Sequence, residues 1–290
     1  IALVLATAMA YVLSAYITRI IWDLAWRAER VAAGESNVRL ETWTRSELGT
    51  LARAVERMRE KLEGKAYVEE MATNLSHELK TPLAAIRGSA ELLEGPASND
   101  AAARAKFLAN IQSEVARLDR IVSELLKLSR IESQPPGTEI PAIDAGPAAK
   151  DIAEMYQRRA ADLGLVFHAE LAETALPIRI VEMQLKQLLT NLLDNAMQFT
   201  AAGRAVLFTA RRKDRVVEFE IRDEGAGIEP ELLPKIFDRF FTTANPRTGN
   251  RGTGLGLAIA KSIATASGGG ISVESELGKG SVFLVTFPAA

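Results

Sequence analysis

The chain has 290 residues, of which 48% are hydrophobic and 25% charged, so it is long enough for two or three domains with at least one substantial core. Its 35 basic and 37 acidic residues are well mixed and give a net charge of -2, which indicates no nucleic-acid partner. Cysteine is absent, which excludes disulfides, thiol catalysis and cysteine-ligated zinc. With only two histidines, any bound metal is expected to have oxygen ligands.

The N-terminal residues 1–17 are uncharged, and Arg19, Arg27 and Arg30 follow them. This length lies at the short end of the bilayer-spanning range, and the following basic residues suit a helix whose C-terminal end lies in the cytoplasm. Residues 1–18 are therefore predicted to be the C-terminal part of a transmembrane helix. A buried core helix is the alternative that the length leaves open, and a cleaved signal peptide fits less well because no basic region precedes the apolar run.

Two helices are predicted next, at residues 17–33 and 46–63, with apolar residues at three- and four-residue steps on the second. A connector of about twelve residues allows them to run parallel, and two such pairs would bury their apolar stripes as a four-helix coiled coil in a dimer. The runs Arg30 to Glu35 and Ser46 to Gly49 resemble the HAMP signal-relay module. This module is assigned to residues 19–65.

A helical hairpin is predicted over residues 66–134. Apolar residues recur every three or four positions at 68–93 and again at 107–128, with a break at Gly95-Pro96. Two long amphipathic helices of this kind favour a dimer, in which they would form a four-helix bundle.

The first hairpin helix carries a histidine beside a carboxylate, His77-Glu78. His77 lies about 200° around the helix from both Leu75 and Leu79, so its imidazole is expected to face outward. An isolated helical histidine is more often structural than catalytic, and the role of His77 therefore depends on what the rest of the chain supplies.

The pattern changes after a linker at Pro135-Pro136-Gly137, and a domain of mixed helices and strands is predicted at residues 140–290. Helices are expected at residues 147–163, 181–199 and 255–266, and strands at 165–171, 205–211, 216–222, 270–275 and 281–287. Helices covering one face of a mixed sheet would make this domain a two-layer α/β sandwich.

Three short segments of this domain predict a nucleotide site. Asn191 and Asn195 lie four residues apart on a helix, so both amides share a face and can help a hard cation such as Mg²⁺ hold phosphate oxygens. Asp223 ends a strand just before Gly225 and Gly227, so its carboxylate can accept a hydrogen bond from an exocyclic amine while the glycines allow close backbone approach. This arrangement favours adenine over guanine.

The third segment is Gly252-Thr253-Gly254-Leu255-Gly256, which opens a helix whose unpaired backbone N–H groups can bind a polyphosphate. Between the glycine clusters, the polar run 242–251 follows several aromatic residues and is predicted to be a hinged lid. Each segment alone is weak evidence, because Gly-x-Gly turns, paired asparagines and aromatic clusters are common. Their order within roughly 65 residues is what predicts a site.

Together these segments resemble the ATP-binding domain of sensor histidine kinases, in the superfamily shared with Hsp90, the gyrase ATPase subunit and MutL. The hydrolysing members place a water-activating Glu four residues before the metal-binding Asn, where this chain has Asn191, so the resemblance favours a kinase over an ATPase. The family often has Lys or Arg where this chain has Gln198. Arg239, or another lid residue, is the candidate for the missing cationic phosphate contact.

The run His77-Glu78-Leu79-Lys80-Thr81-Pro82 resembles the phosphoacceptor motif of the same family. A neutral imidazole can attack the γ-phosphorus if a carboxylate holds its other N–H, and Glu78 is adjacent to His77 for that purpose. The resemblance implies that Thr81 aligns a water that dephosphorylates the partner protein. The run Thr81 to Gly88 resembles the CreC-type subfamily.

The resemblance covers residues 17–290 and implies a homodimeric sensor histidine kinase, anchored in the bacterial inner membrane with its catalytic part in the cytoplasm. ATP and Mg²⁺ are the expected cofactors, and His77 is expected to pass its phosphoryl group to an aspartate of a response-regulator receiver domain. Two alternatives remain open: an ATP-driven conformational machine of the gyrase or Hsp90 type, and a pseudokinase scaffold without chemistry. His168 lies in a predicted strand and is expected to be structural.

Overall fold

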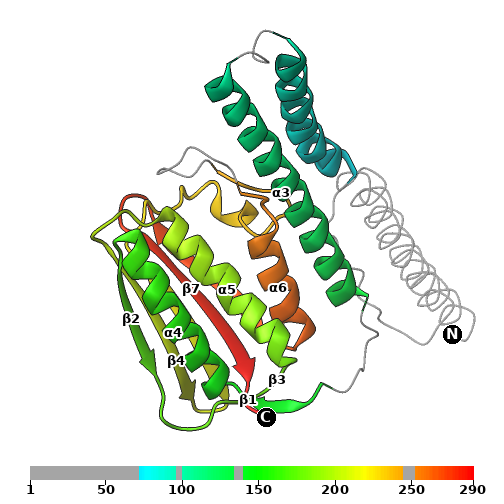
Figure 1. Ribbon diagram of the computed structural model, residues 1–290. Coiled ribbons are helices and arrows are strands. Elements are labelled where there is room, and N and C mark those ends of the chain that lie inside the picture. Colours follow the sequence, from blue (N-terminus) through cyan, green and yellow to red (C-terminus); the bar gives the residue numbers. More distant parts are fainter. Residues whose placement is uncertain (1–71, 96–99, 134–139, 244–251) are drawn as a thin grey trace, which may run out of the picture. The chain divides into compact units, whose positions relative to one another are not determined.

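The computed structural model describes residues 72–95, 100–133, 140–243 and 252–290 (Figure 1). The predicted membrane helix, the HAMP module, the Pro135 to Gly137 linker and residues 244–251 of the predicted lid lie outside these ranges. Within the described ranges, no helix is both long and apolar enough to cross a membrane.

The hairpin consists of a helix at residues 72–94 and helix α3 (Ala101–Glu132), which confirms the predicted pair of helices. Asp100 is the N-cap of α3, and its side-chain Oδ1 accepts hydrogen bonds from the backbone N–H groups of Ala102 and Ala103. These bonds satisfy donors that the first turn of a helix cannot pair internally.

The α/β domain is built on a five-stranded mixed sheet in the order β2-β4-β5-β7-β6. Strands β2 and β4 are parallel, and the other neighbouring pairs are antiparallel. The strands are β2 (Val166–Leu171), β4 (Ala205–Lys213), β5 (Val216–Asp223), β6 (Gly270–Glu276) and β7 (Gly280–Pro288).

A second, smaller sheet pairs β1 (Ala142–Asp144) with β3 (Pro177–Arg179) in antiparallel fashion, which the sequence did not predict. The Asp144 side chain accepts hydrogen bonds from the backbone N–H groups of Gly146 and Leu176, and so ties the start of the next helix to the segment before β3.

Three helices lie side by side on one face of the five-stranded sheet (Figure 1): α4 (Gly146–Leu163), α5 (Glu182–Phe199) and α6 (Gly256–Ala266). Their bounds agree with the predicted ones to within about a residue, and the two-layer α/β sandwich is confirmed. α4 ends where Gly164 adopts a left-handed backbone with φ of 67°.

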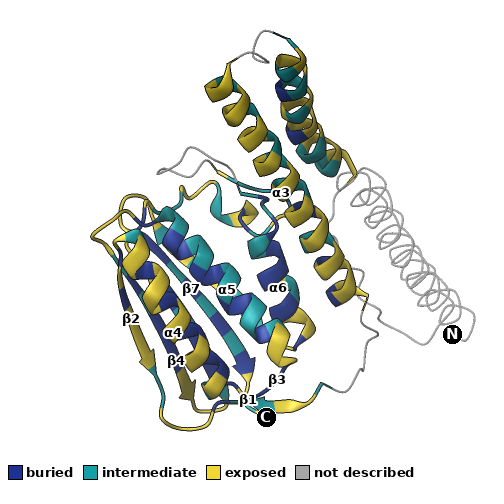
Figure 2. Ribbon diagram, in the orientation of Figure 1, coloured by how far each residue is buried: buried dark blue, intermediate teal, exposed yellow. Residues whose placement is uncertain are grey.

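The core lies between the helices and the sheet, where the dark blue residues of Figure 2 gather. Along β5, Val217, Phe219 and Ile221 are fully buried, while Glu218 and Glu220 alternate with them and pair with arginines on the opposite face. Because side chains alternate along a strand, the helix-facing row continues to the last residue of β5, Asp223. The sheet therefore directs the Asp223 side chain toward the helices.

Candidate active site

Asp223 is the most deeply buried acid of the predicted site, with 5% of its surface exposed. Its Oδ1 accepts hydrogen bonds from the backbone N–H groups of Gly225 at 2.8 Å and Ser281 at 3.3 Å. Burial raises the pKa of this carboxyl to about 6, and the two hydrogen bonds oppose the shift. A carboxylate of this kind is suited to accept a hydrogen bond from a bound group that replaces water.

Helix α5 presents a polar stripe to the space beside Asp223. Asn191, Asp194, Asn195 and Gln198 recur at three- and four-residue steps, opposite a row of leucines that are fully buried. The amide Nδ2 of Asn191 donates to the Gly256 carbonyl at 2.9 Å, which leaves its Oδ1 as an acceptor. Asn195 makes no hydrogen bond to another described residue, so its amide remains available to a ligand.

Glycine is required at two of the predicted positions. A Cβ on Gly227, whose φ is 70°, would lie 2.1 Å from the Glu276 carbonyl oxygen. A Cβ on Gly254, whose φ is 69°, would lie 2.4 Å from the Phe240 carbonyl carbon. These glycines let the two loops pack tightly at the edge of the site.

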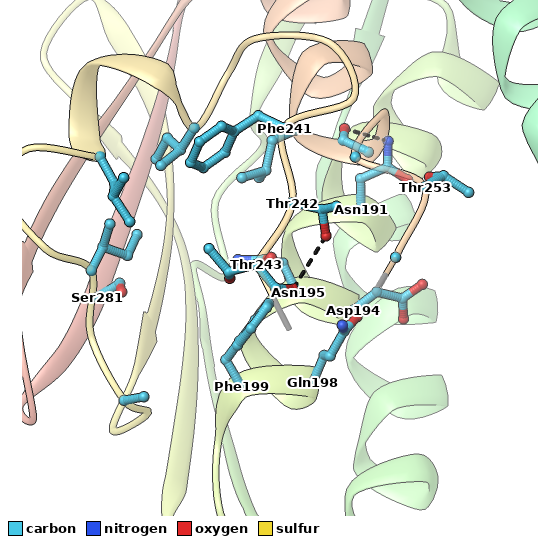
Figure 3. Close-up of a pocket in the computed structure, with 18 of the residues that line it drawn as sticks. Asn191, Asp194, Asn195, Gln198, Phe199, Phe241, Thr242, Thr243, Thr253 and Ser281 are labelled. Atoms are coloured by element: carbon cyan, nitrogen blue, oxygen red, sulfur yellow. Dashed lines mark hydrogen bonds between the residues drawn. The ribbon is translucent and has the colours of Figure 1, made fainter. Parts of the chain in front are cut away.

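A cavity of about 420 Å³ lies where these elements meet. Figure 3 shows Asn191, Asn195 and Gln198 along α5, together with Phe241 and Thr242 from the segment after the short helix η2 (Leu233–Lys235). The predicted residues that line the cavity are Asn191, Asn195, Asp223, Gly227, Gly252, Thr253, Gly254 and Gly256. The structure thus brings the three predicted segments to one cavity.

Three of the residues predicted to bind the nucleotide do not line this cavity: Gly225, Leu255 and Arg239. The backbone N–H of Gly225 donates a hydrogen bond to Asp223 and so helps to hold that side chain. Leu255 is fully buried. The Arg239 guanidinium forms a salt bridge with Glu132 at the end of α3. In this arrangement Arg239 is therefore not in a position to contact a phosphate in the cavity, and its predicted role stays a prediction.

The hairpin contributes two lining residues that the sequence did not indicate, Arg120 and Glu124 of α3. The Thr253 hydroxyl donates a hydrogen bond to Glu124 Oε2. Burial raises the pKa of Glu124, although the Thr253 bond and the nearby Arg120 charge oppose the shift. No local pattern in the sequence could place these residues here, because their position depends on contacts between segments more than 120 residues apart.

His77 is exposed on the helix at residues 72–94, on the outward face that the helical pattern predicts. Its neighbour Glu78 is held by a salt bridge of 3.0 Å from Arg117 of α3 to Oε2. The Thr81 hydroxyl, one turn away, donates to the His77 carbonyl at 3.3 Å. The imidazole is therefore accessible, while the Glu78 carboxylate is held by α3 and the Thr81 hydroxyl by the backbone of His77.

The donor set suits a hard cation held partly by a ligand. Asn191 Oδ1 and the Asn195 amide oxygen are neutral oxygen donors on one helix face, the type that Mg²⁺ accepts when phosphates and waters supply its remaining ligands. No cluster of three or more His, Asp or Glu residues that could hold a metal occurs among the described residues. The site fits a metal brought with a phosphate better than a separate protein-bound ion.

Three protein-family models match successive parts of the chain. Residues 12–64 match the HAMP domain, residues 67–134 the His Kinase A (phospho-acceptor) domain, and residues 180–290 the histidine kinase-, DNA gyrase B-, and HSP90-like ATPase. Sensor protein CreC of Escherichia coli (strain K12) is 36% identical over 232 residues, which are 79% of this chain and 47% of CreC. The chain thus spans about half the length of this curated relative.

Two solved structures share the fold. Histidine kinase ThkA in complex with response regulator protein TrrA gives a TM-score of 0.65 at 25% identity, and the match covers 81% of this chain and 66% of that one. Full-length ShkA in complex with AMPPNP gives a TM-score of 0.53 at 32% identity, covering 77% and 46%. With HAMP, phosphoacceptor and ATPase modules in succession and a cavity built from the family's motifs, the chain belongs to the sensor histidine kinases.

Proposed function

We propose that this chain is the signal-relay and catalytic part of a homodimeric sensor histidine kinase. It transfers the γ-phosphoryl group of ATP to His77 and then to an aspartate of a response-regulator receiver domain. The observation that carries this proposal is one cavity lined by Asn195, Asp223 and the glycine run, on a chain whose hairpin exposes His77.

ATP is the nucleotide that the cavity favours. Asp223 faces the cavity with Oδ1 already taken by two backbone donors, so Oδ2 is the oxygen that accepts the adenine amine. The start of α6 follows the glycine run and supplies backbone N–H groups for the phosphates. Mg²⁺ bound by Asn191, Asn195 and phosphate oxygens would neutralise charge on the leaving group. The ShkA structure was determined with AMPPNP, which agrees with this assignment.

The reaction at His77 exchanges one bond for another. A lone pair on an imidazole nitrogen forms the N–P bond, the bond from the γ-phosphorus to the bridging oxygen breaks, and ADP leaves. The proton on the other ring nitrogen is held or accepted by Glu78, whose Oε2 is fixed by Arg117. Positioning supplies most of the catalysis, because the protein contributes no covalent step beyond the nucleophile.

Helix α3 contacts both the segment that carries His77 and the cavity. Arg117 contacts Glu78, the neighbour of His77, while Arg120 and Glu124 line the cavity. At 1.5 Å per residue, these two lie about 5 to 10 Å along the axis from Arg117. This supports delivery of the nucleotide to His77 by a modest movement of the α/β domain, within a protomer or across a dimer.

Dimerisation is supported by the surface of α3. Leu108, Val115 and Val122 recur every seven residues and are each about half exposed, at 48%, 48% and 50%. A row of this kind forms the seam between helices in a bundle. A second copy of the chain would cover it and complete a four-helix bundle.

The remaining parts of the proposal follow from the matched modules. The HAMP match next to the apolar N-terminal run supports a membrane anchor with the catalytic part in the cytoplasm. ThkA was crystallised with a response regulator protein, which supports a receiver domain as the partner. Thr81, one turn from His77, would align a water for dephosphorylation of that partner, so the kinase would have a phosphatase activity as well.

The test is transfer of label from ATP carrying ³²P at the γ position. The account expects acid-labile, base-stable label on the wild type and on His168→Gln, because His168 lies exposed on β2 away from the site. His77→Gln should carry none. Persistence of the label in His77→Gln would exclude this acceptor, and nucleotide binding without any label in the wild type would favour a scaffold.

A further inference from the structure

The cavity is unusually acidic for a site that takes a polyphosphate. Its charged lining residues are Glu124, Asp194, Asp223 and Glu229 on the acidic side, and Arg120 on the basic side. Asp194 is neutralised in part by Arg159, which pairs with it from outside the cavity. Arg120 is thus the one cation among the described residues that line the cavity, and it comes from the hairpin.

We propose that Arg120 of α3 binds the phosphates of the nucleotide, so that the hairpin carrying the phosphoacceptor histidine completes the nucleotide site of the α/β domain. This inference rests on the nucleotide-binding part of the proposed function. It assigns the cationic contact to a residue outside the segments that carry the family's nucleotide motifs.

Arg120 is free to make this contact. Its side chain is exposed, and it forms no hydrogen bond or salt bridge with another described residue. Arg239, the candidate favoured by the sequence, is instead occupied by Glu132. A guanidinium offers planar, paired N–H donors that match phosphate oxygens, whereas Gln198 on α5 can offer only a neutral amide.

The position of Arg120 is supported by contacts between the residues that follow it on α3 and the α/β domain. Glu124, one turn away on the same face, accepts the Thr253 hydroxyl. Glu132 accepts Arg239 and also Ser262 of α6, and Leu128 between them is buried. This row of contacts holds α3 against the α/β domain beside the glycine run, where the polyphosphate is expected.

A functional consequence follows from the origin of Arg120. A phosphate that bridges Arg120 and the glycine run would add, while nucleotide is bound, a further link between the hairpin and the α/β domain to those made by Glu124 and Glu132. Nucleotide would then help set the position of the α/β domain relative to the helix pair that bears His77. Glu124 would oppose the same phosphates, so that Arg120 also offsets the repulsion from its neighbour on α3.

The test compares two ligands by calorimetric titration of the full chain: AMPPNP with Mg²⁺, and adenosine. Arg120→Ala should weaken AMPPNP binding by about tenfold or more and leave adenosine binding unchanged, because a charge-assisted contact to phosphate is lost. Arg130→Ala removes an equally exposed arginine of α3 that does not line the cavity, and it should bind both ligands as the wild type does.

A second variant separates a phosphate contact from a packing role. Gln198→Lys supplies a cation from α5, which also lines the cavity, and in the Arg120→Ala background it should recover AMPPNP affinity. The wild type should also lose AMPPNP affinity with added salt more steeply than Arg120→Ala does.

The inference is overturned if Arg120→Ala binds AMPPNP as tightly as the wild type, if it loses adenosine to the same extent, or if Gln198→Lys recovers nothing. These outcomes differ from a failure of the proposed function. That failure would appear in the wild type itself, as absence of AMPPNP binding or absence of label on His77.

Discussion

The hairpin and the α/β domain bury their apolar side chains to very different extents. Helix α3 has 32 residues and buries Ile121, Leu128 and Ile131, whereas α5 has 18 residues and buries seven apolar side chains between the sheet and its neighbouring helices. The α/β domain is therefore complete in a single chain. The hairpin leaves an apolar row exposed, which a second copy of the chain would cover in the proposed dimer. The proposed acceptor, His77, therefore lies on the part of the molecule that this dimer would complete.

The largest expected effect concerns the exposed apolar row of α3, which we propose joins two chains. Introducing Val115→Glu with Val122→Glu would place charges in the seam between helices, and the dissociation constant of the dimer should rise by at least about 100-fold. Sedimentation equilibrium measures this change. Met183→Glu, at a 73% exposed apolar residue of α5, is the control and should leave the association unchanged. A dimer that tolerates both charges would place its interface elsewhere.

The packing of the α/β domain is tested by a matched pair of glycines. Gly227 and Gly278 both have positive φ, but a Cβ on Gly227 meets the Glu276 carbonyl whereas one on Gly278 meets nothing within 4 Å. Gly227→Ala should lower the free energy of unfolding by at least about 3 kcal/mol, and Gly278→Ala by only about 1 kcal/mol from backbone strain. Urea unfolding measures both. Equal losses would mean that the loop around Gly227 is not held against the β6–β7 turn.

Asp223→Asn should raise the free energy of unfolding of the α/β domain and at the same time abolish nucleotide binding. The pKa of this buried acid is raised from 3.8 to about 6, so the folded state binds the proton more tightly than the unfolded state. In the wild type this group therefore costs stability as the pH rises from about 4 to about 6. At pH 7 the free energy of unfolding of the variant should be about 2 kcal/mol higher than that of the wild type, as measured by urea titration. The variant should not bind AMPPNP.

A variant that is no more stable than the wild type at pH 7 would contradict a buried, ionised Asp223. The pH dependence of the difference is the internal control. Below about pH 3, where the acid is protonated in both the folded and the unfolded state, the gain should disappear.

The affinity for nucleotide should also depend on pH through the protonation of Asp223, with a smaller effect. Below about pH 6 a proton on Asp223 occupies the oxygen expected to accept the adenine amine, so affinity should fall by up to about tenfold per pH unit. Titration of the wild type with AMPPNP between pH 5 and pH 8 measures this. An affinity that is constant over that range would remove Asp223 from base recognition.

The sequence predicted those parts of the molecule whose signal is local. The four-residue spacing of Asn191 and Asn195 predicted that both amides share one face of α5, and Asp223 was predicted at the end of a strand, where the structure has it. The glycine run was predicted at the start of α6 because a helix start needs partners for its N–H groups. These features together predicted the fold of the α/β domain and most of its cavity.

The parts that the sequence did not predict depend on long-range contacts. Strands β1 and β3 have three residues each and pair across more than 30 intervening residues, which gives no periodic signal. Arg120 lines the cavity and Arg239 pairs with Glu132 because α3 packs beside the glycine run. Neither the spacing of residues nor the composition of the sequence predicts the contact between α3 and the α/β domain.

The most direct measurement of the central claim follows both fates of the γ-phosphate of ATP in one reaction. Peptide mapping at neutral pH quantifies phosphohistidine at position 77, and a phosphate assay quantifies free phosphate. We expect early phosphorylation of His77 with little free phosphate, and neither product in Asp223→Asn. Steady release of phosphate with His77 unmodified would contradict it and identify an ATPase of the conformational-machine type.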